Sequence, residues 1–346
     1  MLPGHERRQA RRHRPTLERS TPAPTAEDGP SAAAFHREGT SLVPARPAVA
    51  VIGATGFIGG ALVSRLRDLG VATESFTRGR PFIDSRGALR GQWDAVNTVY
   101  WLAGSIRPAT AAEDPAQGIA DRHALQMLLD AIERERPDIR VVTAGSGGTV
   151  YDARQPAPYD EESPVSPANA YGAAMWELEQ LVSSARDSAI LRVANAYGPG
   201  QVARRGQGVV AHWMSNIAAG REVQLIGSEQ VARDYVYVDD VVGALVRVHL
   251  QRSNVPQVIN IGSGRPTTLG ELLRLIEDVV APTSVSVRRE PGRSFDAAST
   301  WLDVSLAAST LDWRPTVELR DGLARTWRHV RIADRHPVGN EPEQRS

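Results

Sequence analysis

Three glycines at three-residue spacing begin the part of the chain best suited to holding a ligand. Gly53, Gly56 and Gly59 follow the β-branched run at 49–52, and a helical apolar period continues from 58 to 69. The first glycine permits a tight turn, the second lets the backbone approach a phosphate, and the third lets helix and strand pack closely. A strand, a glycine turn and a helix in this order predict a dinucleotide pyrophosphate site at the helix N-terminus.

The end of the next predicted strand bears on which dinucleotide is held. The segment 71–77 reads as a strand, and Arg78 follows it. NAD-selective units place an acidic residue about 20 residues beyond the glycines, whereas a guanidinium there suits the 2′-phosphate of NADP. We therefore favour NADP(H) and keep NAD(H) as the alternative, since Arg78 could also be a solvated loop residue.

The rest of the chain alternates strand and helix patterns, which predicts an α/β fold with a doubly wound parallel sheet. Further strands are predicted at 96–103, 140–144, 189–193 and 258–261, short strands near 223–226, 235–238 and 285–288, and helices at 120–133, 171–184, 212–219, 239–250 and 269–280. Right-handed crossovers place the loops that follow the strands at one edge of the sheet, where ligands bind in such folds.

Composition excludes several classes of function. The 346 residues carry 40 basic and 40 acidic side chains, every basic one is Arg, and cysteine is absent. A net charge of zero gives no global reason to expect nucleic acid or an anionic membrane as partner. No apolar run is long enough to span a bilayer or to serve as a signal peptide. We expect a cytoplasmic protein with no disulfides and no metal ion.

Several further motifs occur in a fixed order along the chain. They are Gly53-Ala-Thr-Gly-Phe-Ile-Gly59, Tyr100-Trp-Leu-Ala-Gly104, Gly147-Gly-Thr-Val-Tyr151, Asn169-Ala-Tyr171, Leu191-Arg-Val-Ala-Asn-Ala-Tyr-Gly-Pro-Gly200, Arg233-Asp-Tyr-Val-Tyr-Val-Asp-Asp240 and Asn260-Ile-Gly-Ser-Gly264. From about residue 48 to 330 the chain resembles the extended short-chain dehydrogenase/reductase family of nucleotide-sugar epimerases, dehydratases and ketoreductases. The C-terminal half, from 208–213 to 326–327, is most similar to dTDP-4-keto-6-deoxyhexose 4-ketoreductases.

The resemblance implies roles for residues at matching positions. Tyr171 matches the catalytic tyrosine. The residues expected at the cofactor, besides the three glycines, Arg78 and Tyr171, are Thr55, Phe57, Ile58, Leu102, Ala103 and Gly104. The residues expected at a nucleotide-sugar substrate are Arg107, Asn195, Val209, Arg233, Arg293 and Asp296. Arginine forks suit a diphosphate because they bind it bidentately.

The same resemblance implies a domain plan. A Rossmann domain is expected at 47–196, with 239–265 returning to it. A smaller substrate-binding α/β lobe is expected at 197–238 and 266–332. Tails are expected at 1–46 and 333–346, because they contain no sustained apolar period. A homodimer is expected through the helices at 120–133 and 171–184.

Three positions depart from the family pattern. Met175 stands four residues after Tyr171, where the family has a lysine that binds the nicotinamide ribose and lowers the tyrosine pKa. Gly147 stands where a catalytic serine or threonine is usual, so Ser146 or Thr149 is expected to bond to the sugar carbonyl. Asp121 stands near the position of a helix asparagine.

The missing lysine indicates the direction of the reaction. Unperturbed tyrosine has a pKa near ~10 and is protonated at neutral pH. An epimerase first needs tyrosinate as a base, whereas a reductase needs a proton donor. We therefore expect an NADPH-dependent ketoreductase acting on a dTDP-4-keto-6-deoxyhexose. The alternatives are a nucleotide-sugar 4-epimerase and a catalytically impaired NAD(P)-binding regulatory protein.

Overall fold

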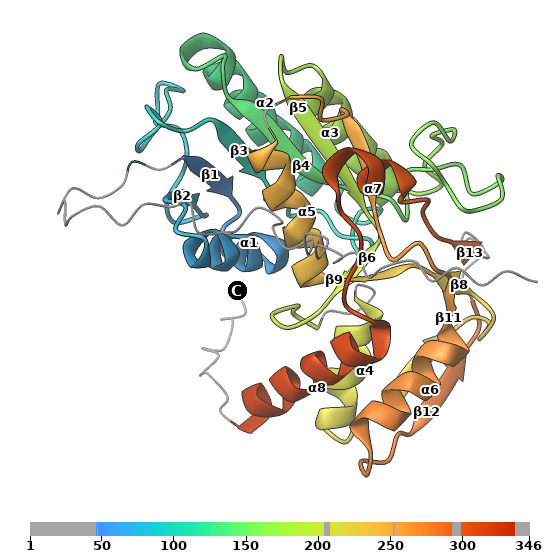
Figure 1. Cartoon of the computed structure of the whole chain (residues 1–346). Coiled ribbons are helices and arrows are strands. Elements are labelled where there is room, and N and C mark those ends of the chain that lie inside the picture. The colour runs from blue at the N-terminus through green and yellow to red at the C-terminus, as the bar shows by residue number, and fades with distance from the viewer. Residues whose placement is uncertain (1–45, 47, 204–207, 252, 293–298, 336–346) are drawn as a thin grey trace, which may run out of the picture. The chain divides into compact units, whose positions relative to one another are not determined.

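A six-stranded parallel sheet organises the described chain (Figure 1). The computed structural model describes residues 46, 48–203, 208–251, 253–292 and 299–335. The sheet order is β10-β5-β4-β3-β1-β2, with β1 (Val49–Ile52), β2 (Thr73–Phe76), β3 (Thr98–Trp101), β4 (Arg140–Ser146), β5 (Ser188–Val193) and β10 (Val258–Ile261). All five pairings are parallel. The strand order reverses between β1 and β3, which is where a doubly wound sheet leaves a crevice for a ligand.

Helices cover both faces of this sheet. One face is covered by α1 (Phe57–Asp68), α5 (Val238–Leu250) and α7 (Ser305–Leu311), and the other by α2 (Ala116–Glu135) and α3 (Ala170–Ser183). Alternate strand residues divide between the two cores: Val49 and Val51 of β1 pack with α1 and α5, while Ala50 and Ile52 pack on the side of α2 and α3. The predicted doubly wound α/β fold is confirmed.

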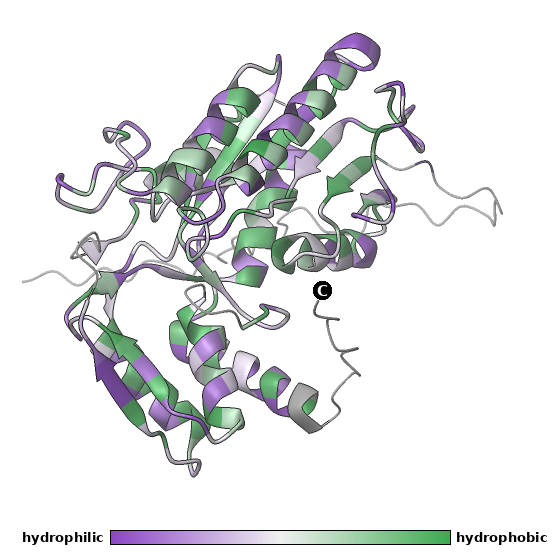
Figure 2. Cartoon of the chain, turned by 180° about the vertical axis from the view of Figure 1, so that it is seen from behind, coloured by the Kyte–Doolittle hydropathy of each residue, from purple (hydrophilic) through white to green (hydrophobic). Residues whose placement is uncertain are grey.

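The remaining elements form a third core. It lies among α4 (Val209–Ala218), α6 (Leu269–Val280) and α8 (Leu319–Arg335), with β7 (Val223–Ile226) and β12 (Val287–Glu290) paired in parallel. Two small sheets connect this region to the rest: β6 (Asn195–Tyr197) with β9 (Tyr235–Tyr237), and β8 (Ala232–Arg233) between β11 (Thr267–Thr268) and β13 (Ser299–Thr300). In Figure 2 these helices carry both hydrophilic and hydrophobic residues, as expected where one side packs on a core.

The sequence predicted most elements and missed a few. α2 begins at Ala116 and α4 at Val209, both earlier than expected, and the strand at 71–77 forms only over 73–76. α7 and α8 were not predicted. α8 is strongly charged, and only a few apolar residues, such as Leu323 and Trp327, mark its buried side. α8 ends at Arg335, so residues 333–335 belong to this helix and not to a tail. The predicted division into two domains remains a prediction.

Candidate functional site

The turn between β1 and α1 needs glycine at two of its positions. Gly53 has a φ of +91°, and a Cβ there would lie 2.6 Å from backbone atoms of Leu102 and Ala103. A Cβ at Gly59 would lie 2.2 Å from the carbonyl oxygen of Gly53. The turn therefore lies directly against the loop that follows β3, and any side chain at these positions would force backbone apart.

The N-terminus of α1 is open for an anion. Gly56 is the N-cap, no side chain caps the helix, and the first turn contains no acidic residue. Free N–H groups and the positive end of the helix dipole suit a pyrophosphate. The predicted residues Gly53, Thr55, Gly56, Phe57, Ile58 and Gly59 all lie at this turn. The residues present thus fit a dinucleotide.

Asp121 on α2 is hydrogen-bonded to the loop that follows Gly104. Its carboxylate accepts hydrogen bonds from the backbone N–H groups of Ser105 at 2.7 Å and Ile106 at 3.0 Å, and from the Ser105 hydroxyl at 2.8 Å. An asparagine side chain offers one acceptor oxygen, whereas a carboxylate offers two. The acidic residue at this position therefore holds three donors of the loop beside the predicted cofactor site.

Tyr171 lies in the first turn of α3, beside the loop that follows β4. Asn169 caps this helix by accepting a hydrogen bond from the Gly172 N–H at 2.9 Å. A Cβ at Gly172 would lie 2.5 Å from the Thr149 carbonyl oxygen, so helix and loop approach very closely. Ser146 lies close enough to Tyr171 for hydrogen bonding to lower the pKa of the phenol, and the Ser146 hydroxyl accepts a bond of 2.7 Å from the Thr149 hydroxyl. The structure thus brings the three predicted hydroxyls together.

The surroundings of Tyr171 keep its phenol protonated. Burial raises the pKa of Tyr171, and the hydrogen bond with Ser146 offsets this only in part. In the part of the chain that the structure describes, no cationic side chain contributes to the shift. The expectation of an ordinary tyrosine pKa is therefore corrected: the pKa is raised, because the phenol is partly withdrawn from water and no cation among the described residues offsets this.

Met175 packs where the family has a charge. It follows Tyr171 by one turn of α3, is partly buried, and contacts two apolar clusters, one between the sheet and α2–α3 and one around Tyr151 and Leu302. A thioether carries no charge and donates no proton. Met175 therefore serves packing, and it cannot lower the pKa of the tyrosine.

The structure also shows why Gly147 carries no catalytic hydroxyl. A Cβ at Gly147 would lie 2.6 Å from Leu302 Cδ1 and 3.0 Å from the Arg192 carbonyl oxygen, and Leu302 is itself buried. A side chain there would enter the core. Ser146 and Thr149 are the hydroxyls of this loop that accompany Tyr171.

Asn195 and Arg233, predicted to hold the substrate diphosphate, lie on adjoining segments. The backbone N–H and the Nδ2 of Asn195 donate to the Asp234 carbonyl oxygen at 3.0 and 2.9 Å. A Cβ at Gly148 would lie 3.9 Å from the same Nδ2, so Asn195 also neighbours the loop of Ser146. These contacts bring Asn195 to the hydroxyl cluster, while Arg233 directly precedes the Asp234 that Asn195 contacts.

Asp234 is a residue of this region that sequence reasoning missed. Its buried carboxylate accepts hydrogen bonds from the N–H and hydroxyl of Ser263, at 2.7 and 2.6 Å, and from the N–H groups of Gly264 and Leu302, at 3.2 and 3.3 Å. Burial raises the pKa of Asp234, and the Ser263 donors offset part of this. The available signal was a charged residue directly before the apolar run 235–238.

Arg78 is free to meet a ligand, whereas its neighbour is engaged. Arg80 forms an ion pair with Glu74 and lies over the Phe76 ring at 5.6 Å. Arg78 is exposed in the turn closed by the pairing of Thr77 with Arg80. Its guanidinium forms no hydrogen bond or ion pair with any described residue. This position is consistent with a role in binding a cofactor phosphate.

Two further predicted residues that the structure describes, Arg107 and Val209, are not drawn into the cluster. The guanidinium of Arg107 is half-buried and has no hydrogen bond or ion pair within the described ranges. Val209 begins α4 and packs on the core of that region. Arg293 and Asp296 lie outside the described residues, so their predicted contacts stay predictions.

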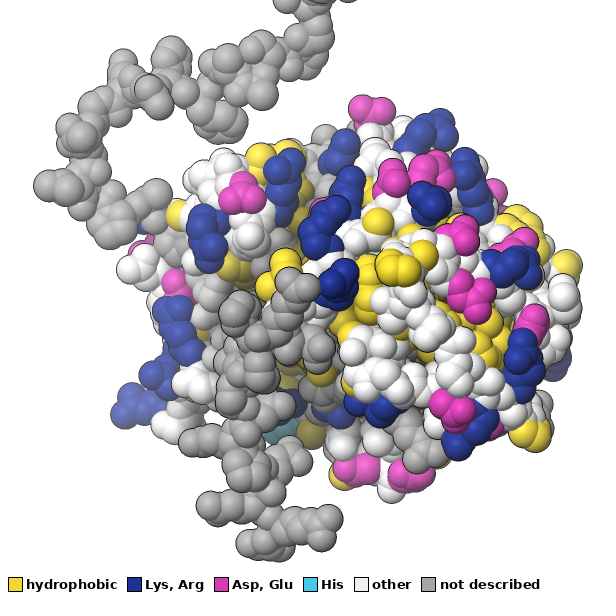
Figure 3. Space-filling model, turned by 90° about the horizontal axis from the view of Figure 1, so that it is seen from below, with side chains coloured by type: hydrophobic (Ala, Val, Ile, Leu, Met, Phe, Trp, Pro, Cys, Tyr) yellow, Lys and Arg dark blue, Asp and Glu magenta, His cyan; other side chains and the backbone are white. Residues whose placement is uncertain are grey.

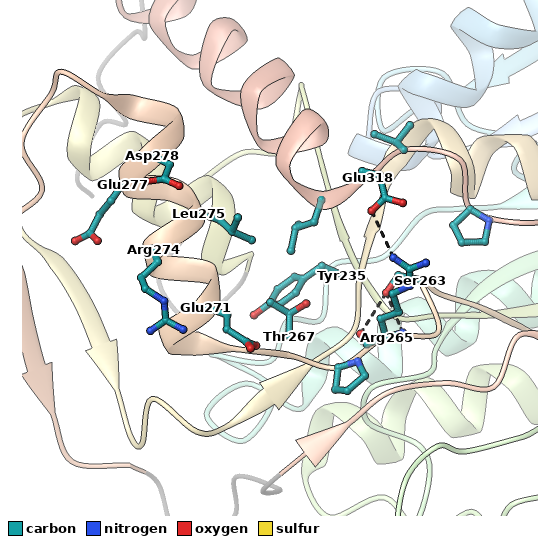
Figure 4. Close-up of a pocket in the computed structure, with 14 residues that line it drawn as sticks. Tyr235, Ser263, Arg265, Thr267, Glu271, Arg274, Leu275, Glu277, Asp278 and Glu318 are labelled. Carbon is teal, nitrogen blue, oxygen red and sulfur yellow. Dashed lines mark hydrogen bonds and ion pairs between the residues drawn. The ribbon is translucent and has the colours of Figure 1, made fainter.

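A cavity of about 710 Å³ lies elsewhere, between α6, the segment 263–267 and the start of α8 (Figure 4). Tyr235 lies at its centre in this view, near Thr267, and the ion pair of Arg265 with Glu318, at 3.5 Å, borders one side. None of the predicted site residues lines this cavity. It is therefore separate from the cluster around Tyr171.

The face seen in Figure 3 has no patch of one charge sign that would indicate a ligand class. On the face seen in Figure 3, acidic and basic side chains are interspersed. No described helix is long and apolar enough to cross a membrane. Within the same residues, no three His, Cys, Asp or Glu side chains are grouped so that they could hold a metal ion.

A doubly wound sheet with a glycine turn, and a tyrosine beside two hydroxyls, define an NAD(P)-dependent oxidoreductase of the short-chain dehydrogenase/reductase type. The profile of the "NAD dependent epimerase/dehydratase family" matches residues 49–262, and the chain belongs to this family. The resemblance drawn from the motifs is thereby confirmed.

Two relatives with the same sequence identity to this chain are named for different reactions. The chain is 32% identical over 305 residues to a UDP-glucose 4-epimerase of Mycolicibacterium smegmatis, covering 80% of this chain and 96% of that one. It is 32% identical over 197 residues to a dTDP-4-dehydro-6-deoxyglucose reductase of Escherichia coli, covering 56% and 61%. The solved UDP-glucose 4-epimerase of Thermus thermophilus in complex with NAD matches with a TM-score of 0.71 and 26% identity, over 82% of this chain and 99% of that one. Identity alone does not choose between the reactions.

Proposed function

We propose that this protein is an NADPH-dependent ketoreductase that acts on a nucleotide-diphosphate 4-keto-6-deoxyhexose, with dTDP as the nucleotide. The observation that carries the proposal is the pairing of Tyr171, whose pKa is raised by burial, with the uncharged Met175 one turn later. A reductase needs a protonated phenol at neutral pH, and these surroundings favour that form.

The chain's own residues would perform the proton transfer. A reduced dinucleotide, which the turn of Gly53 and Gly56 would hold, would supply the hydride for the sugar carbonyl carbon. Tyr171 donates its phenolic proton to the carbonyl oxygen, so the C=O bond becomes a C–H and an O–H bond, and solvent returns a proton to the phenolate. Ser146, held by the hydrogen bond from Thr149, fixes the carbonyl oxygen beside the phenol. Asn195 and Arg233 hold the diphosphate.

Arg78 supports NADP over NAD as the cofactor. It is exposed at the end of β2 and has no partner among the described residues, while Arg80 is occupied by Glu74. A free guanidinium at this strand end can bind a 2′-phosphate bidentately. The assignment of NADPH rests on this residue.

The proposal includes a homodimer formed through α2 and α3. These helices lie side by side on one face of the sheet and are joined by the ion pair of Arg122 with Glu177, at 3.8 Å. Ile119 on α2 is 69% exposed. A second copy on this face would remove its side chain from water.

A nucleotide-sugar 4-epimerase is the second candidate. It is favoured by the match to the Mycolicibacterium smegmatis epimerase, which extends over 96% of that relative. Such an enzyme must first oxidise a hydroxyl, and it would need Tyr171 as a phenolate. Tightly retained NAD in the purified protein would support this candidate.

The test is NADPH consumption with a panel of dTDP- and UDP-4-keto sugars, repeated with the Tyr171→Phe variant. The proposal expects NADPH oxidation with a 4-keto-6-deoxy sugar nucleotide, and a loss of about 10²–10⁴-fold in the variant because the proton donor is gone. Rapid interconversion of UDP-glucose and UDP-galactose without added cofactor would instead establish the epimerase. Unchanged turnover in the variant would remove Tyr171 from the mechanism.

A further inference from the structure

A buried ion pair joins the helix of Tyr171 to the strand next to that of Ser146. Glu179 lies two turns after Tyr171 on α3, and its Oε2 accepts a hydrogen bond of 2.9 Å from Arg192 Nε on β5. The Glu179 and Arg192 side chains are only 1% and 3% exposed. The other ion pairs of the described chain each have at least one partner with a more exposed side chain.

The backbone around Ser146 is shaped to receive this pair. Arg192 is in register with Gly145, the residue before Ser146 on β4. A Cβ at Gly145 would lie 2.3 Å from Glu179 Oε1, so the carboxylate occupies the space that a side chain would fill. The end of β4 is therefore pressed directly against the acidic side chain of α3.

The arginine also holds the far end of the same loop. Its guanidinium carbon lies 4.9 Å from the ring centre of Tyr151 and 5.5 Å from that of Trp176. Tyr151 ends the loop that begins at Ser146, and its hydroxyl donates a hydrogen bond of 2.6 Å to Asn260 Oδ1. Arg192 thus contacts α3 and the end of the loop as well as Glu179.

Stability does not explain why such a pair is present. Two ions lose their hydration in the core, and apolar residues of similar volume often replace buried pairs with no loss of stability. Here Arg192 Nη1 is buried without a hydrogen-bond partner among the described residues. The hydration that the two ions lost is therefore only partly replaced, which makes this pair a weak source of stability.

We propose that Glu179 and Arg192 are a positioning pair, which holds the end of β4 against α3 so that Ser146 stays within hydrogen-bond reach of Tyr171. Neither residue touches the reacting atoms. The inference rests on the proposed function for its turnover readout, because it concerns the proton donor of that reaction. It applies equally if Tyr171 serves another reaction of the family.

The first test replaces the pair by apolar residues of similar size, in the double variant Glu179→Leu/Arg192→Met. We expect a folded protein whose kcat falls by about 10²-fold, since a displacement of about 1 Å can cost that much. KM for the nucleotide sugar should change by less than twofold. The matched control is Glu290→Leu/Arg288→Met, which removes a more exposed pair of 2.6 Å on β12, away from α2 and α3, and should leave kcat unchanged.

The second variant, Arg192→Lys, guards against misfolding of the first. It keeps the charge but loses the planar fork that binds Glu179 and stacks on the two rings. A lower kcat with unchanged KM is expected here too. Each pair variant should be non-additive with Ser146→Ala, because both would remove the same contact to Tyr171. Wild-type kcat in either folded pair variant, or simple additivity with Ser146→Ala, would overturn the proposal.

A third readout needs no turnover. The phenolate absorbance of Tyr171 can be titrated as the difference between each protein and its Tyr171→Phe counterpart. The bond from Ser146 lowers the pKa of Tyr171, so the pair variants should shift this titration to higher pH. An unchanged titration would overturn the positioning role. If no substrate of the panel is turned over but the pair variants still shift the titration of Tyr171, only the proposed function would be overturned.

Discussion

The hydroxyl of Thr149 donates a hydrogen bond of 2.7 Å to the hydroxyl of Ser146, which lies close enough to Tyr171 to lower the pKa of the phenol. Thr149 therefore stands one hydrogen bond further from the phenol than Ser146 does. The order of the three groups implies different roles for the two hydroxyls, although both were open candidates for the same role.

Removing Ser146 should cost more than removing Thr149. Ser146→Ala is expected to lower kcat by about 10²-fold, because it takes away the group beside the phenol and the carbonyl oxygen. Thr149→Val should cost less, since it loosens Ser146 without deleting it. Steady-state NADPH oxidation measures both, and Ser184→Ala, at the far end of α3, is the control. A larger loss in Thr149→Val would reverse the order assigned to the hydroxyls.

The pH dependence should follow the raised pKa of Tyr171. Reduction uses the protonated phenol, so its rate should stay flat through neutral pH and fall only above about 10, the ordinary tyrosine value. Oxidation of the product alcohol uses the phenolate, so the rate of oxidation should rise as the pH approaches and passes the pKa of Tyr171. Rates of both directions across pH test this. A reduction rate that falls between pH 7 and 9 would contradict the assignment.

Met175→Lys should accelerate oxidation of the product alcohol, the reaction that needs the phenolate form of Tyr171. An ammonium one turn from Tyr171 would lower the pKa of the phenol, and each unit of lowering increases the phenolate fraction about tenfold at neutral pH. Alcohol oxidation at pH 7 is therefore expected to accelerate. Met175→Leu conserves volume and should leave both directions unchanged. No gain in oxidation would mean that the lysine position no longer faces the phenol.

Arg78→Ala should weaken NADPH binding and leave NADH binding unchanged. Loss of one charge-assisted contact is worth about 1.5–3 kcal/mol, or about 10- to 150-fold in Kd. Fluorescence titration with each cofactor measures the difference. Arg67→Ala removes an exposed arginine from the last turn of α1 and is the control. Equal losses for NADPH and NADH would show that Arg78 does not read the 2′-phosphate.

Two adjacent glycines of α1 should respond in opposite ways to alanine. At Gly59 a Cβ would lie 2.2 Å from the Gly53 carbonyl oxygen, so Gly59→Ala should destabilise the fold and distort the turn. At Gly60 the nearest atom would be 3.6 Å away, and Gly60→Ala should stabilise the fold by up to about 1 kcal/mol through helix propensity. Denaturant unfolding compares them. Similar stabilities would contradict the tight packing at Gly59.

Local patterns in the sequence predicted much of the fold. The β-branched run before Gly53 and the helical period after it were sufficient to locate β1 and α1, and Leu269–Val280 is a helix with the predicted ends. α8 was not predicted, since its charged residues dilute the apolar period that Leu323 and Trp327 carry. Packing against α4 and α6 stabilises this helix, and a single sequence does not reveal such packing.

The sequence by itself determined the glycine turn from residue types at short, fixed spacings, and its resemblance to the family singled out Tyr171 and the uncharged Met175. The tertiary structure alone decided that Gly147 faces Leu302, that Thr149 lies behind Ser146, and that Glu179 meets Arg192 in the core. Leu302 is far from Gly147 along the chain, and no local period relates the two. The environment of the phenol, and hence its raised pKa, arises only when these segments pack together.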